Sequence, residues 1–381
     1  MKSEHFETVD ARPDVRAEAR DGGGIERRLL DVVESTLRDL QGDARFSAGV
    51  TFDSALDRDL GLDSLSRMEL LLRTERAFGV DLPEDTLAGA ERVRDLYAAL
   101  LRARPGGAPA PLRSAAAPLA GAAPEAEAPL EATTLLQVLH WHLQAHPDRI
   151  QIVHLADGGQ RGVSYRELAA GADAIAAGLQ RCGLQPRQCV AIMLPTSAEY
   201  FQTYLGIIRA GGVPVPIYPP ARASQLEEHV VRHTQILLNA QAAAMVTVPE
   251  AMTVAQLLRA RVPGLRHIVT PQSLAQGAGA AAAVDVRADD IAFIQYTSGS
   301  TGNPKGVVLT HANLLANVRA MGRAARAGAE DVFVSWLPLY HDMGLIGAWL
   351  GSLYYGVPLV LLSPLSFLVR PERWLWAIHR Y

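Results

Sequence analysis

Cysteine and lysine are scarce in this sequence, and each scarcity is informative. The two cysteines, Cys182 and Cys189, form no CxxC pair, so a thiolate zinc site is not expected. Two thiols in a chain of 381 residues also indicate a reducing compartment, which we take to be the cytoplasm. Of the 36 basic residues, only Lys2 and Lys305 are lysines. An internal lysine in so arginine-rich a chain suggests a chemical use for a compact ammonium group.

Long apolar runs are also missing. No stretch of 18 apolar residues occurs, so no membrane-spanning helix is expected, and residues 1–24 lack the apolar core of a secretory signal. The content of 49% hydrophobic and 20% charged residues is typical of a globular protein. It excludes wholesale disorder, a collagen-like chain and a disulfide scaffold.

The charge is unevenly distributed along the chain. Residues 25–102 hold 16 acidic and 11 basic side chains, whereas residues 131–381 hold 16 acidic and 19 basic ones. Neither part has the concentrated positive charge of a nucleic-acid binder, so no nucleic-acid partner is expected.

Composition and periodicity divide the chain into four parts. Residues 1–24 are polar and are expected to form a flexible N-terminus. Residues 25–102 place apolar side chains at helical spacing in three segments, which predicts a small all-α bundle. Residues 103–130 are expected to form a linker, because 19 of the 25 residues from Pro105 to Pro129 are Ala, Pro or Gly.

The last part, residues 131–381, alternates amphipathic stretches with short apolar runs. This alternation predicts a layered α/β domain with a mostly parallel sheet. The strands are expected at residues 190–195, 213–218, 243–248, 292–297, 332–338 and 358–363.

A serine stands at the expected start of the second helix, in the run Gly61-Leu62-Asp63-Ser64. Gly61 suits the end of a loop, and Asp63 suits a helix cap. A phosphodiester on Ser64 would face the free N–H groups of the helix start. On these four residues alone, a serine that only caps the helix is the simpler interpretation.

Residues 25–102 as a whole resemble the acyl and peptidyl carrier protein family, in which the serine of GxDS carries a 4′-phosphopantetheine arm. Gly61, Asp63, Ser64 and the later Phe78-Gly79-Val80 match that family. The resemblance implies that a phosphopantetheinyl transferase attaches the arm covalently to Ser64. Three nearby acidic residues either attract basic partner surfaces or simply belong to a solvated helix face: Asp59, Glu69 and Glu75.

A second motif, YTSGSTGNPKG, follows the strand expected at residues 292–297. Glycines let several backbone N–H groups converge on one anion, hydroxyls donate to phosphate oxygens, and Lys305 adds a mobile charge. The spacing is not that of the GxxxxGK[ST] loop, so a P-loop NTPase is disfavoured.

This motif resembles the phosphate-binding signature of the adenylate-forming superfamily, which includes acyl-CoA synthetases and adenylation domains. The resemblance implies ATP and Mg²⁺ as cofactors and assigns seven residues to the phosphates: Thr297, Ser298, Gly299, Ser300, Thr301, Gly302 and Lys305. Lys305 is not the family's catalytic lysine, so no catalytic residue and no metal ligand is assigned.

A third motif, WLPLYHDMGLIG, resembles the superfamily segment whose histidine lies near the acyl-adenylate. We therefore assign His341 to substrate binding, with no proton-transfer role. The apolar residues around it either line an alkyl pocket or pack in the core: Tyr340, Met343, Leu345, Ile346, Trp349 and Tyr354.

Residues 210–220, 337–347 and 361–381 are most similar to long-chain fatty acyl-AMP ligases. This resemblance implies activation of a fatty acid and its transfer to a carrier thiol, for lipid, polyketide or lipopeptide biosynthesis with downstream synthase modules. The family's adenine, ribose and C-terminal lysine motifs are not found, so the adenylation domain is expected to be incomplete. Two alternatives stay open: a carrier module beside an inactive adenylation part, and an amino-acid-activating domain of a nonribosomal synthetase.

Overall fold

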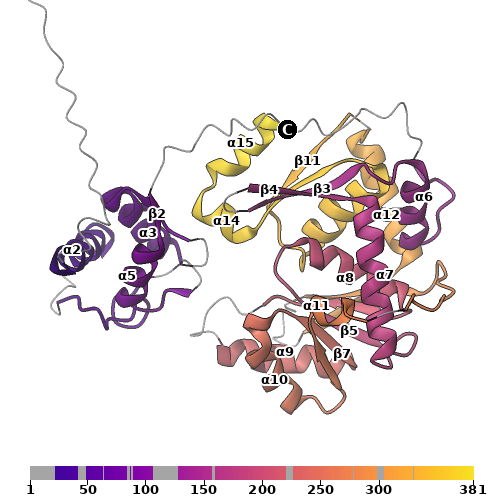
Figure 1. Cartoon of the computed structure of the whole chain (residues 1–381), viewed down its shortest axis with the longest axis horizontal. Helices are drawn as coiled ribbons and strands as arrows, with labels where there is room; N and C mark the ends of the chain where they lie inside the picture. The colour runs from indigo at the N-terminus through magenta and orange to yellow at the C-terminus, as the bar shows by residue number, and fades with distance from the viewer. Residues whose placement is uncertain are drawn as a thin grey trace, which may run out of the picture. The chain divides into compact units, whose positions relative to one another are not determined.

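The computed structural model describes most of the chain, namely residues 22–41, 49–62, 64–83, 86, 89–105, 128–156, 159–219, 226–277, 279–297, 304–328 and 330–381. The chain divides into two compact units, Met1–Arg113 and Ser114–Tyr381, each of which is described here by itself (Figure 1). Residues 1–21 and 106–127, where the flexible N-terminus and most of the linker are expected, lie outside the described residues. The proposed domain boundaries stay a prediction.

The first unit is helical, as its periodicity predicts. Its elements are α2 (Gly22–Gln41), α3 (Ser64–Phe78), α5 (Val93–Arg102) and a strand pair, β1 (Val80–Asp81) with β2 (Arg104–Pro105). Along α2, Ile25, Leu29 and Val33 recur at intervals of four residues and are fully buried. This stripe forms the core of the bundle, because residues four apart lie on one helix face.

The second unit contains two four-stranded sheets among helices (Figure 1). The first sheet has the order β11 (Phe333–Ser335), β12 (Leu359–Leu362), β3 (Ile150–Ala156) and β4 (Gly159–Ser164). The second has the order β6 (Val213–Pro216), β5 (Cys189–Met193), β7 (Ala244–Thr247) and β8 (His267–Val269), and all its pairs are parallel. The expected fold class, an all-α unit followed by a layered α/β unit, is confirmed.

Helices occupy the segments between these strands. They are α6 (Leu135–Ala145), α7 (Tyr165–Arg181), α8 (Ala198–Arg209), α9 (Leu226–Asn239), α10 (Met252–Arg261), α11 (Pro271–Ala275), α12 (His311–Ala325), α13 (Gly351–Tyr355), α14 (Pro364–Val369) and α15 (Glu372–Arg380), with a short 3₁₀ turn η3 (Pro249–Ala251) and a π-helical segment η4 (Met343–Leu350). The approach of α8 to α7 is close at Gly206, where an added Cβ would lie 2.7 Å from the Ile175 side chain.

Two features of the sheets differ from the sequence prediction. β9 (Ile291–Thr297) does not join a parallel sheet but pairs antiparallel with β10 (Lys305–Thr310), because the connection is too short for a crossover. β3 and β4 are an antiparallel pair that the apolar pattern does not reveal, since Gly159–Ser164 is polar and mostly exposed. Within the described part of the chain, no helix is long and apolar enough to cross a membrane.

Buried, uncharged histidines are a further property of the second unit. His229 and His233 on α9 stack with ring centroids 3.8 Å apart, and both are buried. Burial lowers the pKa of His229 to about 4. Burial and the neighbouring His229 lower the pKa of His233 to about 3. Both rings are therefore neutral in the folded chain at pH 7.

We predict that the free energy of unfolding of this unit decreases as the pH falls from 6.5 towards 4. In this range histidines bind protons in the unfolded chain, whereas the buried rings of the folded chain do not. A His229→Phe substitution should reduce the number of protons taken up on unfolding near pH 5.5 by about one. Neither ring nitrogen of His229 has a hydrogen-bond partner, so the variant should fold at pH 8. Urea unfolding across this pH range measures the effect, with exposed His140→Gln as the control. An unchanged proton uptake in His229→Phe would contradict the prediction.

Candidate functional site

The first candidate residue, Ser64, is the first residue of α3. Before it, Gly61 adopts a left-handed φ of 64°, which a glycine tolerates better than other residues. Asp63, expected to cap the helix, lies outside the described residues, as does the side chain of Ser64. The position fits a phosphodiester, because the free N–H groups of a helix start favour an anion.

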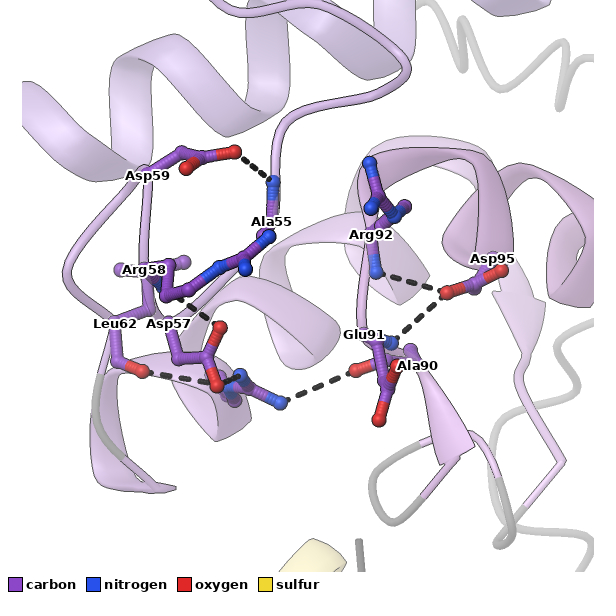
Figure 2. A network of polar contacts seen from close by, with 10 residues as sticks. Ala55, Asp57, Arg58, Asp59, Leu62, Ala90, Glu91, Arg92 and Asp95 are labelled. Carbon is purple, nitrogen blue, oxygen red and sulfur yellow. Dashed lines mark hydrogen bonds and ion pairs between the residues drawn. The ribbon is translucent and has the colours of Figure 1, made fainter. Parts of the chain in front are cut away.

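The segment before Ser64 is organised by carboxylates that accept backbone hydrogen bonds (Figure 2). Asp59 Oδ2 accepts from the Ala55 N–H at 2.8 Å. Asp95 Oδ2 accepts from the N–H groups of Glu91 and Arg92 at 2.9 and 2.8 Å, which caps the start of α5. The loop is thus held by many local polar contacts.

The three acidic residues near Ser64 are engaged within the unit. Asp59 binds the Ala55 N–H, and Glu75 Oε1 accepts from the Leu82 N–H at 2.8 Å. Glu69 pairs with Arg73 at 2.7 Å on the next turn of α3. All three carboxylates therefore have an internal structural role, which neither sequence interpretation foresaw.

The second candidate site is anchored by the β9–β10 hairpin. Its register places Thr297 opposite Lys305. Thr297 therefore stands at the start of the connection between the two strands and Lys305 at its end. Both residues are exposed. The remaining phosphate-loop residues lie outside the described residues: Ser298, Gly299, Ser300, Thr301 and Gly302. The described ends fit an anion, because a cation and a hydroxyl donor meet at the mouth of a glycine-rich turn.

The turn that carries His341 is fixed from two sides. The Tyr200 hydroxyl on α8 donates to the Leu339 carbonyl at 2.8 Å. The Gln295 side-chain amide on β9 donates to the Tyr340 carbonyl at 2.8 Å. The second bond joins the His341 turn to the strand that leads into the phosphate segment. The structure therefore joins the His341 turn to β9, after which the phosphate motif follows in the sequence.

His341 itself is exposed and weakly held. Its side chain is 70% exposed, and Nδ1 lies 3.2 Å from Asp342 Oδ1. The same Asp342 oxygen accepts from the Met343 N–H at 2.7 Å and so caps η4. Asp342 is thus a helix cap, and the free face of the His341 ring is available to a ligand.

The apolar residues after His341 mostly pack in the core. Leu345, Trp349 and Tyr354 are at most 1% exposed, and Trp349 packs edge-on against Phe201 with centroids 4.7 Å apart. Met343, by contrast, is 65% exposed. Core packing, rather than an alkyl pocket, therefore accounts for the three buried side chains.

Sequence reasoning did not identify Gln295 and Tyr200 as supports of the site. A signal for Gln295 was present: it is a single amide in the apolar strand AFIQYT, and a buried amide requires a partner. Tyr200 offers no such signal, because its acceptor lies 139 residues later. Among the described residues, no group of three His, Cys, Asp or Glu side chains can hold a metal ion.

Comparison with known proteins agrees with this geometry. Residues 139–381 match the family described as AMP-binding enzyme, and residues 27–100 match the family of the phosphopantetheine attachment site. The chain belongs to the AMP-binding enzyme family. It carries a phosphopantetheine attachment domain in front of the AMP-binding part, so the carrier and adenylate-forming resemblances are confirmed.

Several relatives act on fatty acids. The medium-chain-fatty-acid–[acyl-carrier-protein] ligase TtuA of Teredinibacter turnerae is 31% identical over 65% of this chain and 44% of its own length. The long-chain-fatty-acid–AMP ligase FadD32 of Mycolicibacterium smegmatis is 35% identical over 59% of this chain and 35% of its own. The crystal structure of a fatty acid AMP ligase from Legionella pneumophila matches with 32% identity and a TM-score of 0.60, over 66% and 43% of the two chains.

The chain spans less than half the length of these relatives. An adenylation domain of a keto acid-selecting nonribosomal synthetase module also matches, with a TM-score of 0.59 at 23% identity. This second likeness shows the shared fold alone.

We predict that Gly344→Ala disturbs the His341 turn, because an added Cβ would lie 2.3 Å from the Pro338 carbonyl oxygen. The matched control is Gly347→Ala on the same η4 segment, where the nearest atom is 4.0 Å away. Gly344→Ala should lower the thermal unfolding midpoint by several degrees, roughly the effect of a 1–3 kcal/mol overpacking strain. Equal midpoints for the two variants would contradict this expectation.

Proposed function

We propose that the polypeptide containing this chain activates a fatty acid as an acyl-adenylate and loads the acyl group onto a phosphopantetheine arm at Ser64. The observation that carries the proposal is the presence, on one chain, of an attachment domain followed by an AMP-binding domain. The similarity of 31–35% to fatty-acid ligases supports a fatty acid as the substrate.

In the activation step, the fatty-acid carboxylate attacks the α-phosphate of ATP, and pyrophosphate leaves. Lys305 and Thr297, at the ends of the β9–β10 connection, would bind the β- and γ-phosphates together with the residues between them. Mg²⁺ would bind through the phosphates and offset their charge. His341 would contact the acyl-adenylate from the turn that Gln295 ties to the same strand.

In the loading step, Ser64 would hold the arm, which supplies a thiol. The acyl group would pass to that thiol as a thioester, with release of AMP and the thiol proton. A phosphopantetheinyl transferase would supply the arm beforehand, and downstream synthase modules would accept the acyl group. A carrier on the same chain would raise the effective concentration of the thiol at the adenylate. We propose the cytoplasm as the compartment, where ATP and coenzyme A are both present.

The competing function is that of a carrier module alone, and the exchange experiment described below distinguishes it from the ligase. It requires the arm at Ser64 but no adenylate formation. The amino-acid-activating alternative has only a likeness of fold in its favour, to a structure with phenylalanyl-adenylate at 21% identity.

We predict a crossed pattern for two variants, tested in the longest natural polypeptide that contains this chain. Lys305→Ala should reduce fatty-acid-dependent ATP–pyrophosphate exchange by roughly 10- to 100-fold, because a charge-assisted bond contributes about 1.5–3 kcal/mol. It should leave arm attachment intact. Ser64→Ala should abolish arm attachment, read by intact mass, and leave the exchange intact.

The wild-type protein decides between the functions. Exchange with a fatty acid supports the ligase proposal, and exchange with an amino acid only would replace it by the synthetase alternative. Arm attachment without any exchange would leave the carrier function alone.

A further inference from the structure

The first turn of α3 carries a buried guanidinium, that of Arg67. Arg67 is 3% exposed, although it carries a permanent charge. Its NH1 donates to the Ala90 carbonyl at 3.2 Å, and its Nε donates to the Leu62 carbonyl at 3.3 Å. Its NH2 lies 3.5 Å from Asp57 Oδ2, and the Asp57 side chain is 40% exposed. Figure 2 shows the residues that supply these acceptors, Asp57, Leu62 and Ala90, from close by.

Burial of this cation is costly, so its contacts must offset a large desolvation penalty. A buried charge is tolerated only when hydrogen bonds satisfy its donors. Here the fork of the guanidinium reaches three acceptors from two segments, the loop before α3 and the loop before α5. A single ammonium point charge does not match this arrangement as well. Arginine identity means little in a chain with so many arginines, but most of the others are exposed. Burial is therefore the informative property.

One of the three acceptors lies two residues before Ser64. Both backbone polar groups of Leu62 are engaged: its N–H donates to the Leu56 carbonyl at 2.8 Å, and its carbonyl accepts from Arg67. The Leu62 side chain is 2% exposed. Arg67, on the first turn of α3, thus reaches back to the residue from which the chain enters that helix.

The Ala90 carbonyl connects this entry to α5. Ala90 precedes α5, and the neighbouring Glu91 carbonyl accepts from the Leu56 N–H at 2.8 Å. The Leu56 carbonyl in turn accepts from the Leu62 N–H. The loop before α3 and the loop before α5 are thus joined both by a backbone bond and by the Arg67 side chain. If the guanidinium is removed, two buried carbonyls lose their partner.

We propose that Arg67 is a positioning residue for arm attachment, which holds the Leu62–Ser64 entry of α3 in the geometry that a phosphopantetheinyl transferase accepts. This inference rests on the proposed attachment at Ser64. In that step the Ser64 oxygen bonds to the phosphorus that bears the pantetheine in coenzyme A. The bond from this phosphorus to the bridging oxygen breaks, the nucleoside bisphosphate leaves, and the serine proton passes to a base of the transferase.

The experiment measures transfer from coenzyme A to the full chain by a broad-specificity phosphopantetheinyl transferase, with intact mass as the readout. Arg67→Gln should lower the kcat of transfer by roughly 10- to 100-fold, because a misplaced acceptor hydroxyl loses the reactive geometry. The KM for the chain should change little, since exposed residues make the docking surface. Arg67→Lys should restore part of the rate.

Two further variants separate positioning from stability. Arg73→Gln is the matched control on the same helix: Arg73 pairs with Glu69 and Asp39, and its side chain is 30% exposed. It should be modified at nearly the wild-type rate. Asp57→Asn removes only the negative charge of the half-exposed partner of Arg67 and keeps an acceptor oxygen. It should fold even if Arg67→Gln does not, with a smaller loss of rate.

Hydrogen exchange gives the second readout. In Arg67→Gln, exchange should accelerate in the peptide spanning residues 56–66 and stay unchanged in α2. Folded Arg67 and Asp57 variants that are modified at the wild-type rate would overturn the inference. Equal acceleration throughout the unit would do so as well, because it would show a merely structural role. A wild-type chain that accepts no arm would instead refute the proposed function.

Discussion

The hydrogen bond from Gln295 to the Tyr340 carbonyl is the contact on which the candidate activation site depends. It joins two segments that are 45 residues apart: the strand that leads into the phosphate loop and the turn that carries His341. Gln295 lies on β9, which is paired with β10, whereas Tyr340 lies in a loop, and a loop has little rigidity of its own. The bond lies in a region that is largely buried, where an amide without a partner would cost about 1–3 kcal/mol. The need to satisfy this buried donor therefore helps to hold β9 and the His341 turn together.

The same logic applies to the turn from the other side. The Tyr200 hydroxyl is fully buried on α8 and donates to Leu339, and Gly344 leaves no space for a side chain beside Pro338. One residue supplies a polar constraint and the other a steric one. Together they hold a turn whose functional residue, His341, has only a weak contact to its neighbour. An exposed residue can be positioned well when hydrogen bonds and close packing hold the backbone that carries it.

Much of this could be predicted from the sequence, and the failures have identifiable causes. The helix Ser64–Phe78 follows from periodicity and a start signal, whereas the antiparallel pairing of β9 with β10 was not predicted. The strand Gly159–Ser164 was missed because pairing with β3, not apolar alternation, makes it a strand. The supports Tyr200 and Gln295 act through backbone carbonyls, and a sequence does not show which distant carbonyl needs a donor.

Arginine bias changes what residue identity can reveal in this chain. Where 34 of 36 cations are arginine, an arginine is the default and a lysine is the exception, so Lys305 is informative by type alone. Arg67 and Arg319 are informative only through their surroundings. Arg67 donates to the Leu62 and Ala90 carbonyls, and Arg319 donates to the Leu130 and Ala132 carbonyls where the second unit begins. In both units a guanidinium thus binds carbonyls of an entering segment, a task for which its several fixed donors suit it better than an ammonium. Substitution by lysine should therefore be least tolerated at these two arginines, while the exposed ones that contact mainly water should accept it.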